Sequence, residues 1–244
     1  MAGVSARDGS AIGTGPFPGR TETLISLMST TAPSTWSYGN ERYAFSQAWV
    51  TKRPFFRAFL ARQPKGQAYL DLGCGSGGTM RVIQESDETA RVFGADIVNS
   101  VRHEALRDKV RVLDLSRDAL PFADASFDVV TAIQVMEHLE NPFLFAREAA
   151  RVLKPGGSFI LSFPSGESVW ARVQYLVSNN ITGFNTVNNH ITFLTRDVFA
   201  KTFLVNFTRE DVRYDGGFVP YVPGVKLPAS KWFSKRVCYF LRKK

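Results

Sequence analysis

The sequence has 244 residues, of which 44% are hydrophobic and 13% aromatic, and this is ample for a packed core. Its two cysteines, Cys74 and Cys238, lie far apart without metal-ligand spacing, which argues against a disulfide framework and a structural zinc site. No apolar run is long enough to cross a bilayer, and no basic region followed by an apolar stretch opens the chain. We therefore expect a globular protein of the reducing cytoplasm.

The formal net charge of +8 raises the question of a polyanionic partner. The region that carries the motifs is mixed or acidic, and no RNA-binding module is recognisable, which argues against nucleic acid. Residues 231–241 alternate apolar groups with cations. They predict either a segment in peripheral contact with a membrane, which would suit a hydrophobic or lipid-linked acceptor, or an edge strand with a solvated tail. Much of the excess charge lies in the C-terminal residues Lys231, Lys235, Arg236, Arg242, Lys243 and Lys244.

The first 37 residues are rich in Gly, Ser, Thr, Ala and Pro without periodicity, which predicts a disordered segment. Apolar residues then recur at helical spacing from Asn40 to Arg62, and Pro54 must interrupt the pattern or begin a new helix. Two short helices are therefore expected before the first strand. We expect residues 38–244 to form a single domain, with a cofactor-binding core at 66–164 and a substrate lid and sheet edge at 165–244.

From residue 68 onward, short apolar segments alternate with helical patterns, which is typical of a doubly wound α/β fold with a mostly parallel sheet. The turn at 154–157 should end the helix before it. Beyond Pro164 the pattern weakens. Strands are predicted at 68–72, 91–97, 110–113, 127–133, 158–163, 209–214 and 236–241, and helices at 79–85, 99–107, 142–153 and 196–203.

A glycine-rich loop follows the first predicted strand and precedes a helix, with glycines at positions 73, 75 and 78. This spacing alone would suit a dinucleotide. However, Asp71 at the end of the strand would repel a pyrophosphate and attract a cation. S-adenosylmethionine carries an ammonium and a sulfonium and has no phosphate, so an acidic strand end, close backbone approach and a helix N-terminus suit it. An ordinary tight turn is the structural alternative.

Two further acidic residues end the next strands. Asp96 could accept hydrogen bonds from both ribose hydroxyls, with Ile97 packed on adenine, although such an aspartate also suits NAD. Asp114 could bind the adenine amino group or merely cap the following turn.

The segments Leu70–Gly78, Gly94–Ile97, Leu113–Leu115, Phe127–Val130 and Leu153–Gly157 together resemble a class I methyltransferase of the small-molecule type, in the group that includes ubiquinone and menaquinone biosynthesis enzymes. The resemblance spans roughly Tyr69–Pro164. It implies a Rossmann-like sheet of seven strands whose last strand is antiparallel, and S-adenosyl-L-methionine as cofactor. It also implies cofactor-binding residues: Asp71, Gly73, Cys74 and Gly75 at the methionyl part, Asp96 and Ile97 at the ribose and adenine, Asp114 and Leu115 at the adenine, and Gln134 near the reactive end.

Methyl transfer needs few catalytic side chains, because the sulfonium already activates the methyl group and the enzyme has to align a nucleophile and exclude water. A hydroxyl acceptor would benefit from a general base. His138 and His190 are the candidates, and packing of either histidine is the alternative. An NAD-dependent oxidoreductase shares the glycine loop and Asp96 but does not explain Asp71 and Asp114. A non-catalytic protein of the same fold is the remaining alternative.

Overall fold

The computed structural model describes residues 48–181, 183–184, 189–218 and 226–244. A seven-stranded sheet with the order β3-β2-β1-β4-β5-β9-β6 organises these residues. A separate pair, β7 (Gly217–Phe218) and β8 (Lys226–Leu227), is antiparallel. The strands of the large sheet are β1 (Ala68–Leu72), β2 (Arg91–Asp96), β3 (Val110–Val112), β4 (Phe127–Ile133), β5 (Leu153–Pro164), β6 (Phe207–Tyr214) and β9 (Arg236–Lys243).

The directions of the strands confirm the predicted doubly wound sheet. Strands β3, β2, β1, β4 and β5 pair in parallel, and β9 pairs antiparallel with both β5 and β6. The carboxyl ends of the five parallel strands therefore share one edge of the sheet, where ligands bind in folds of this type.

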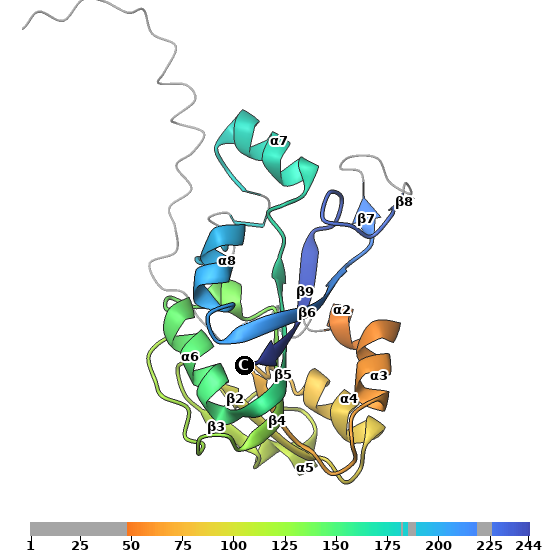
Figure 1. Ribbon diagram of the computed structural model, residues 1–244, viewed down its shortest axis with the longest axis vertical. Coiled ribbons are helices and arrows are strands. Elements are labelled where there is room, and N and C mark those ends of the chain that lie inside the picture. The colour runs from red at the N-terminus through yellow and green to blue at the C-terminus, as the bar shows by residue number, and fades with distance from the viewer. Residues whose placement is uncertain (1–47, 182, 185–188, 219–225) are drawn as a thin grey trace, which may run out of the picture. The chain divides into compact units, whose positions relative to one another are not determined.

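Helices cover both faces of the sheet (Figure 1). One layer contains α6 and α8, and the other contains α2, α3, α4 and α5. Pro54 is the first residue of α3, as expected from its preference for a first helical turn. The bounds are α2 (Ala48–Thr51), α3 (Pro54–Ala61), α4 (Gly78–Ser86), α5 (Glu104–Arg107), α6 (Pro142–Val152), α7 (Val169–Ser178) and α8 (Arg196–Thr202), with a 3-10 turn, η2, at Met136–His138.

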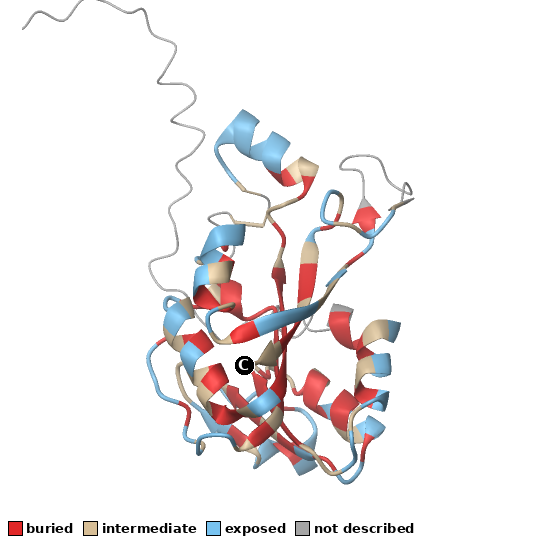
Figure 2. Ribbon diagram, viewed as in Figure 1, coloured by how far each residue is buried: buried red, intermediate tan, exposed pale blue. Residues whose placement is uncertain are grey.

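Each layer buries a hydrophobic core against one face of the sheet (Figure 2). Successive strand residues point to opposite faces, so that Leu70 joins the core beneath α6 and α8 and Tyr69 joins the core beneath α3 and α4. Phe145 of α6 and Phe56 of α3 are among the largest fully buried side chains of their respective cores. The near-continuous apolar sequences of β4 and β5 follow from burial on both faces.

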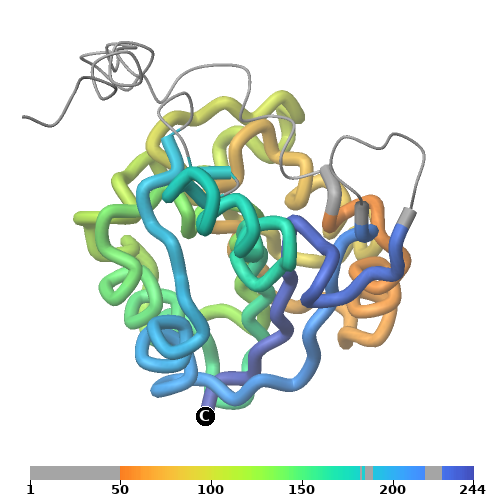
Figure 3. The backbone as a smooth tube through the Cα atoms, turned by 90° about the horizontal axis from the view of Figure 1, so that it is seen from above, coloured from red at the N-terminus to blue at the C-terminus, as the bar shows by residue number. Residues whose placement is uncertain are grey.

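Three local expectations differ from the structure. The helix predicted at 99–107 is confined to α5, because Asn99 accepts a hydrogen bond from the Val101 N–H at 3.3 Å and donates to the Arg107 carbonyl at 2.9 Å. Residues 154–157 belong to β5, although Gly156 has the positive φ of a turn. Helix α7 was not predicted. It follows β5 and stands clear of both helix layers in Figure 1, and seen from above it lies over the middle of the described residues (Figure 3).

The basic C-terminal segment does not form the edge strand that was one of the two structures predicted for it. Strand β9 lies inside the sheet, between β5 and β6, with Cys238 and Leu241 fully buried. Its cations are used within the fold: Arg236 pairs with Asp215 at 2.9 Å and Arg242 with Glu210 at 2.8 Å. Residues 236–243 are therefore an interior strand of the sheet, and contact of the C-terminal region with a membrane stays a prediction.

The segment 1–37, predicted to be disordered, lies outside the described residues, as does the run 185–188 near the predicted lid. Among the helices that are described, none combines the length and the apolar character needed to cross a bilayer.

Candidate cofactor and acceptor site

The loop after β1 passes over the end of β2. The N–H groups of Gly73 and Cys74 both donate to the Ala95 carbonyl, at 2.7 and 3.2 Å. Gly73 has φ +68°, and a Cβ at this position would lie 2.2 Å from Cγ2 of Val135. Glycine is therefore required here both by the backbone conformation and by the close approach of the segment after β4. Cys74 is fully buried, and its contact with a cofactor stays a prediction.

Asp71, near the carboxyl end of β1 and just before this loop, is fully buried. Its Oδ1 accepts a hydrogen bond from the Thr131 hydroxyl of β4 at 2.7 Å. Burial raises the pKa of Asp71 to about 7, the negative charge of Asp96 adds to this effect, and the hydrogen bond from Thr131 opposes it. A cation bound at the loop would stabilise the ionised carboxylate, as the sequence interpretation requires.

Asp96 ends β2 beside the same loop. Its Oδ2 accepts from the Gly75 N–H and its Oδ1 from the Ile97 N–H, both at 2.7 Å. Burial raises the pKa of Asp96, and the backbone hydrogen bonds counteract this rise. Each carboxylate oxygen has a second lone pair, so the residue can still accept hydrogen bonds from two ribose hydroxyls. Ile97 is half-buried next to it.

Asp114 follows β3 and caps a turn. Its Oδ1 accepts from the Ser116 N–H at 2.8 Å, and its carbonyl accepts from the Asp118 N–H at 2.8 Å. The capping role considered for this residue is thus present in the structure, and contact with an adenine stays a prediction. Leu115, beside it, is buried.

Gln134 directly follows β4 and has φ +58°, a conformation that few residues other than glycine adopt. Its N–H donates to the Ser162 carbonyl at 2.9 Å, and its side chain is buried. Among the described residues, Nε2 of Gln134 has no hydrogen-bond partner. A strained backbone that holds an unsatisfied donor is characteristic of a ligand site.

These observations are compatible with the cofactor that the sequence predicts. Glycines allow close approach at the β1 loop, carboxylates end β1 and β2, and the Gln134 amide offers a free donor at the end of β4. Asp71 and the β1 loop would hold the cationic methionyl part, Asp96 the ribose, and Gln134 a group near the reactive end.

A second group of residues extends this edge of the sheet beyond Gln134. The Glu137 carbonyl of η2 accepts hydrogen bonds from the N–H groups of Ile191 and Thr192, at 2.8 and 3.0 Å. The Thr192 hydroxyl also donates to the Leu139 carbonyl. These bonds hold the segment 189–192 against η2, and thereby bring together two histidines that are 52 positions apart in the sequence.

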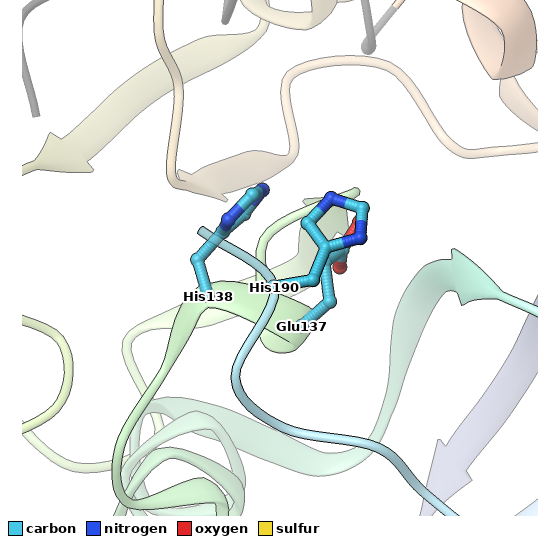
Figure 4. A group of neighbouring side chains, drawn as sticks. All are labelled: Glu137, His138 and His190. Carbon is cyan, nitrogen blue, oxygen red and sulfur yellow. The ribbon is translucent and has the colours of Figure 1, made fainter. Parts of the chain in front are cut away.

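The two candidate histidines are neighbours (Figure 4). The ring centroids of His138 and His190 lie 4.7 Å apart at an interplanar angle of 70°. The Glu137 carboxylate lies beside them, and one ligand-capable atom from each of the three residues lies within 4.8 Å of the others. Phe184 contacts the His190 ring edge-on at a centroid distance of 5.3 Å, so an aromatic wall adjoins the group.

Burial controls the protonation of this group. It lowers the pKa of His138 to about 4, with the nearby His190 adding to the effect, and it also lowers the pKa of His190. Burial raises the pKa of Glu137 to about 8. Both imidazoles are therefore neutral near pH 7. Since a general base works best with a pKa near the operating pH, His138 alone is a weak base.

Sequence reasoning missed two residues of the site. Thr131 binds Asp71, and nothing in a short apolar strand indicates that its one hydroxyl meets a carboxylate on the neighbouring strand. Glu137 was not among the predicted site residues. Its position between a strand end and a histidine was the available signal, because acidic and imidazole groups that adjoin in sequence can share a ligand.

Comparison with known proteins gives the family of the core. Residues 70–161 match a family described as "Methyltransferase domain". A protein of Mycolicibacterium smegmatis named "Probable S-adenosylmethionine-dependent methyltransferase" is 37% identical over 121 residues, covering 48% of this chain and 46% of the relative. The sarcosine/dimethylglycine N-methyltransferase of Aphanothece halophytica is 35% identical over 114 residues, covering 41% of this chain and 39% of the relative. The chain thus spans less than half the length of these curated relatives.

Solved structures support the fold. A structure described as a SAM-dependent methyltransferase from Archaeoglobus fulgidus superimposes with a TM-score of 0.57 at 15% identity, covering 84% of this chain and 100% of that chain. The family and fold imply S-adenosylmethionine as cofactor, and the narrower likeness to ubiquinone biosynthesis enzymes has only loose support. Residues 70–161 form a methyltransferase domain of the class I, S-adenosylmethionine-dependent type.

Proposed function

We propose that this protein moves a methyl group from S-adenosylmethionine to a small-molecule or lipid- or glycan-linked acceptor by in-line displacement. The main support is the convergence at one sheet edge of the β1 loop, Asp96 and the unsatisfied amide of Gln134, within the segment that matches the methyltransferase domain. The bound cofactor supplies an activated methyl group. The residues of the chain have to orient the acceptor and exclude water.

The acceptor side is supported by the segment that carries His190. Hydrogen bonds fix this segment to η2, beside the end of β4, and the Phe184 ring packs edge-on against His190. An acceptor between these rings and Gln134 would lie next to the reactive end of the cofactor. We propose His138 and His190 as groups that contact this acceptor.

A hydrophobic partner is supported by helix α7, which buries only Ala171 and exposes four large apolar side chains. Trp232 is also 44% exposed, and its ring lies under the Arg172 guanidinium and the Lys231 ammonium. Exposed apolar groups flanked by cations suit an anionic lipid surface. We therefore infer that α7 with Lys231 and Trp232, rather than β9, is the surface for peripheral membrane contact. The exposed apolar residues of α7 are Val173, Tyr175, Leu176 and Val177.

Calorimetric titration with S-adenosylmethionine, S-adenosylhomocysteine and NADH tests the function. We expect micromolar binding of the first two compounds and a loss of at least about tenfold in Asp96→Ala, because a charged hydrogen-bond acceptor contributes about 1.5–3 kcal/mol. Asp108→Ala is the matched control, since this aspartate is exposed. Binding of NADH instead would support an oxidoreductase, and binding of none of the three would contradict the proposal.

A further inference from the structure

The group formed by Glu137, His138 and His190 combines two imidazoles with a carboxyl group. Proton transfer alone does not require all three. Within the described residues it is the one set of three histidine, cysteine or carboxylate side chains whose ligand atoms lie close enough to share an ion. Two members come from η2 and the third from the segment 189–192 (Figure 4). No metal ligand was predicted from the sequence, because His190 is 52 positions away from His138 in the chain.

The carboxylate provides an independent observation. Glu137 is 1% exposed, and its Oε2 has no hydrogen-bond partner among the described residues. A buried carboxyl oxygen without a hydrogen-bond partner is costly whether or not the group is ionised, since the oxygen has lost its hydrogen bonds to water and has no replacement. A cation placed between this oxygen and the histidines would provide the missing interaction.

The histidines are oriented as metal ligands usually are. Nδ1 of His138 lies 3.3 Å from the Asn189 carbonyl, which can only accept a hydrogen bond, so the proton belongs on Nδ1 and Nε2 keeps its lone pair. The His190 ring also forms a hydrogen bond with the backbone of Gly183. Backbone carbonyls that fix the ring of a ligating histidine are a regular feature of metal sites.

We propose that Glu137, His138 and His190 bind a divalent transition-metal ion of the zinc type, and that an open coordination position of this ion takes a hydroxyl oxygen of the acceptor. Two imidazole nitrogens with one carboxylate suit zinc and its neighbours, whereas magnesium and calcium prefer oxygen alone. The ligand atoms lie within 4.8 Å of one another. Small side-chain rotations would bring them to the roughly 3.4 Å spacing that metal–ligand distances near 2.1 Å require.

This assignment deepens the proposed function, on which it rests, by naming a class of acceptor. A metal ion lowers the pKa of a bound hydroxyl, so its proton passes to solvent and the oxygen stays on the metal as an anion. The oxygen lone pair then forms the C–O bond while the C–S bond breaks, and the electron pair of that bond remains on sulfur. The products are a methyl ether and S-adenosylhomocysteine. The acceptor is accordingly a hydroxyl compound, and the reaction is an O-methylation.

Cobalt(II) is a suitable probe, because its visible absorption reports coordination and requires no acceptor. The full chain, freed of metal, is titrated with cobalt chloride and followed by absorption and calorimetry. We expect one equivalent to bind, with affinity reduced at least about tenfold in Glu137→Gln and in His190→Gln. The chain has three histidines, and His103→Gln is the matched control because His103 is exposed. Equal affinity in all variants, or no visible band, would overturn the metal site.

Two further measurements separate the possible failures. S-adenosylhomocysteine should bind Glu137→Gln and His190→Gln as it binds the original chain, which also shows that the variants are folded. If the chain binds S-adenosylhomocysteine but no cobalt, the metal site is overturned and the proposed function is not. If the chain binds no S-adenosylhomocysteine, the proposed function itself is overturned. Addition of acetohydroxamate, an oxygen chelator, should shift the cobalt spectrum. An unchanged spectrum would mean a closed site and would overturn the binding of an acceptor oxygen.

Discussion

Gly73 and Gly156 have nearly the same backbone conformation in different surroundings. Their φ angles are +68° and +69°, but a Cβ at 73 would meet Val135 at 2.2 Å, and a Cβ at 156 would meet nothing within 4 Å. We expect Gly156→Ala to lower the free energy of unfolding by about 1–2 kcal/mol through the left-handed conformation alone. Gly73→Ala should lose roughly 1–3 kcal/mol more through overpacking.

Chemical denaturation of both variants measures these costs, and titration with S-adenosylhomocysteine should show weaker binding in Gly73→Ala alone. Equal destabilisation by the two substitutions would mean that Val135 can move aside. The contact with the segment after β4 would then not determine the shape of the loop.

Asp71 makes stability depend on pH. Its pKa is raised from 3.8 to about 7 in the folded protein, so the folded state binds this proton more tightly than the unfolded chain. The contribution of the group to stability is complete below pH 3.8 and is lost as the pH rises toward 7. Asp71→Asn keeps an oxygen acceptor for Thr131 but cannot ionise. The free energy of unfolding of Asp71→Asn, relative to the original chain, should therefore increase from pH 4 to pH 7 and then level off. A difference that is constant with pH would contradict the burial of an ionisable carboxyl.

At the scale of elements, helices α6 and α7 both begin with a side-chain cap but differ in burial. Asn141 accepts a hydrogen bond from the Leu144 N–H at 3.0 Å, and Ser168 accepts from the Ala171 N–H at 3.1 Å. Helix α6 contributes Phe145 and other residues to the core, whereas α7 buries only Ala171.

We expect Asn141→Ala to lower the free energy of global unfolding by about 1 kcal/mol. Ser168→Ala should change it much less, because α7 can fray without exposing a core. Denaturant unfolding measures the global effect, and amide hydrogen exchange should detect the local loosening of α7. A large global effect of Ser168→Ala would show that α7 unfolds together with the sheet.

Elements whose buried apolar residues recur with the period of a strand or a helix were predictable from the sequence. Strands β1 and β4 begin and end at the predicted residues, because apolar residues fill them and turn residues bound them. Helix α7 was missed because its apolar residues lie on all sides of an exposed helix. They therefore lack the one-sided pattern of a packed helix. The position of β9 inside the sheet was likewise hidden, since lysines and arginines in its sequence suggested a solvated edge and their partners lie far away in the chain.

The part of the candidate site that lies at the carboxyl ends of the parallel strands was predictable from the sequence. Asp71, Asp96 and Gln134 lie at the ends of β1, β2 and β4 because parallel strands bring their carboxyl ends to one edge. The pairing of His138 with His190 depends instead on backbone hydrogen bonds between η2 and residues 191–192. No local pattern in the sequence predicts such bonds.

At the scale of the whole molecule, the surface of α7 and Trp232 predicts binding to anionic vesicles. Sedimentation with phosphatidylglycerol vesicles should retain the protein, and phosphatidylcholine vesicles should retain much less, because Arg172 and Lys231 supply the charge. Leu176→Ser and Val177→Ser together should abolish the binding. Val205→Ser is the control, since Val205 is 63% exposed outside this surface. Equal retention of both variants would indicate charge attraction without insertion of α7.

The interior position of β9 has a consequence for synthesis on the ribosome. Strands β5 and β6 emerge first but do not pair with each other, since β9 lies between them and pairs with both. Until residue 243 has left the exit tunnel, one edge of β5 and all of β6 present unpaired backbone groups. The nascent chain is thus most exposed to strand-to-strand association, and most in need of a chaperone, just before this sheet can close.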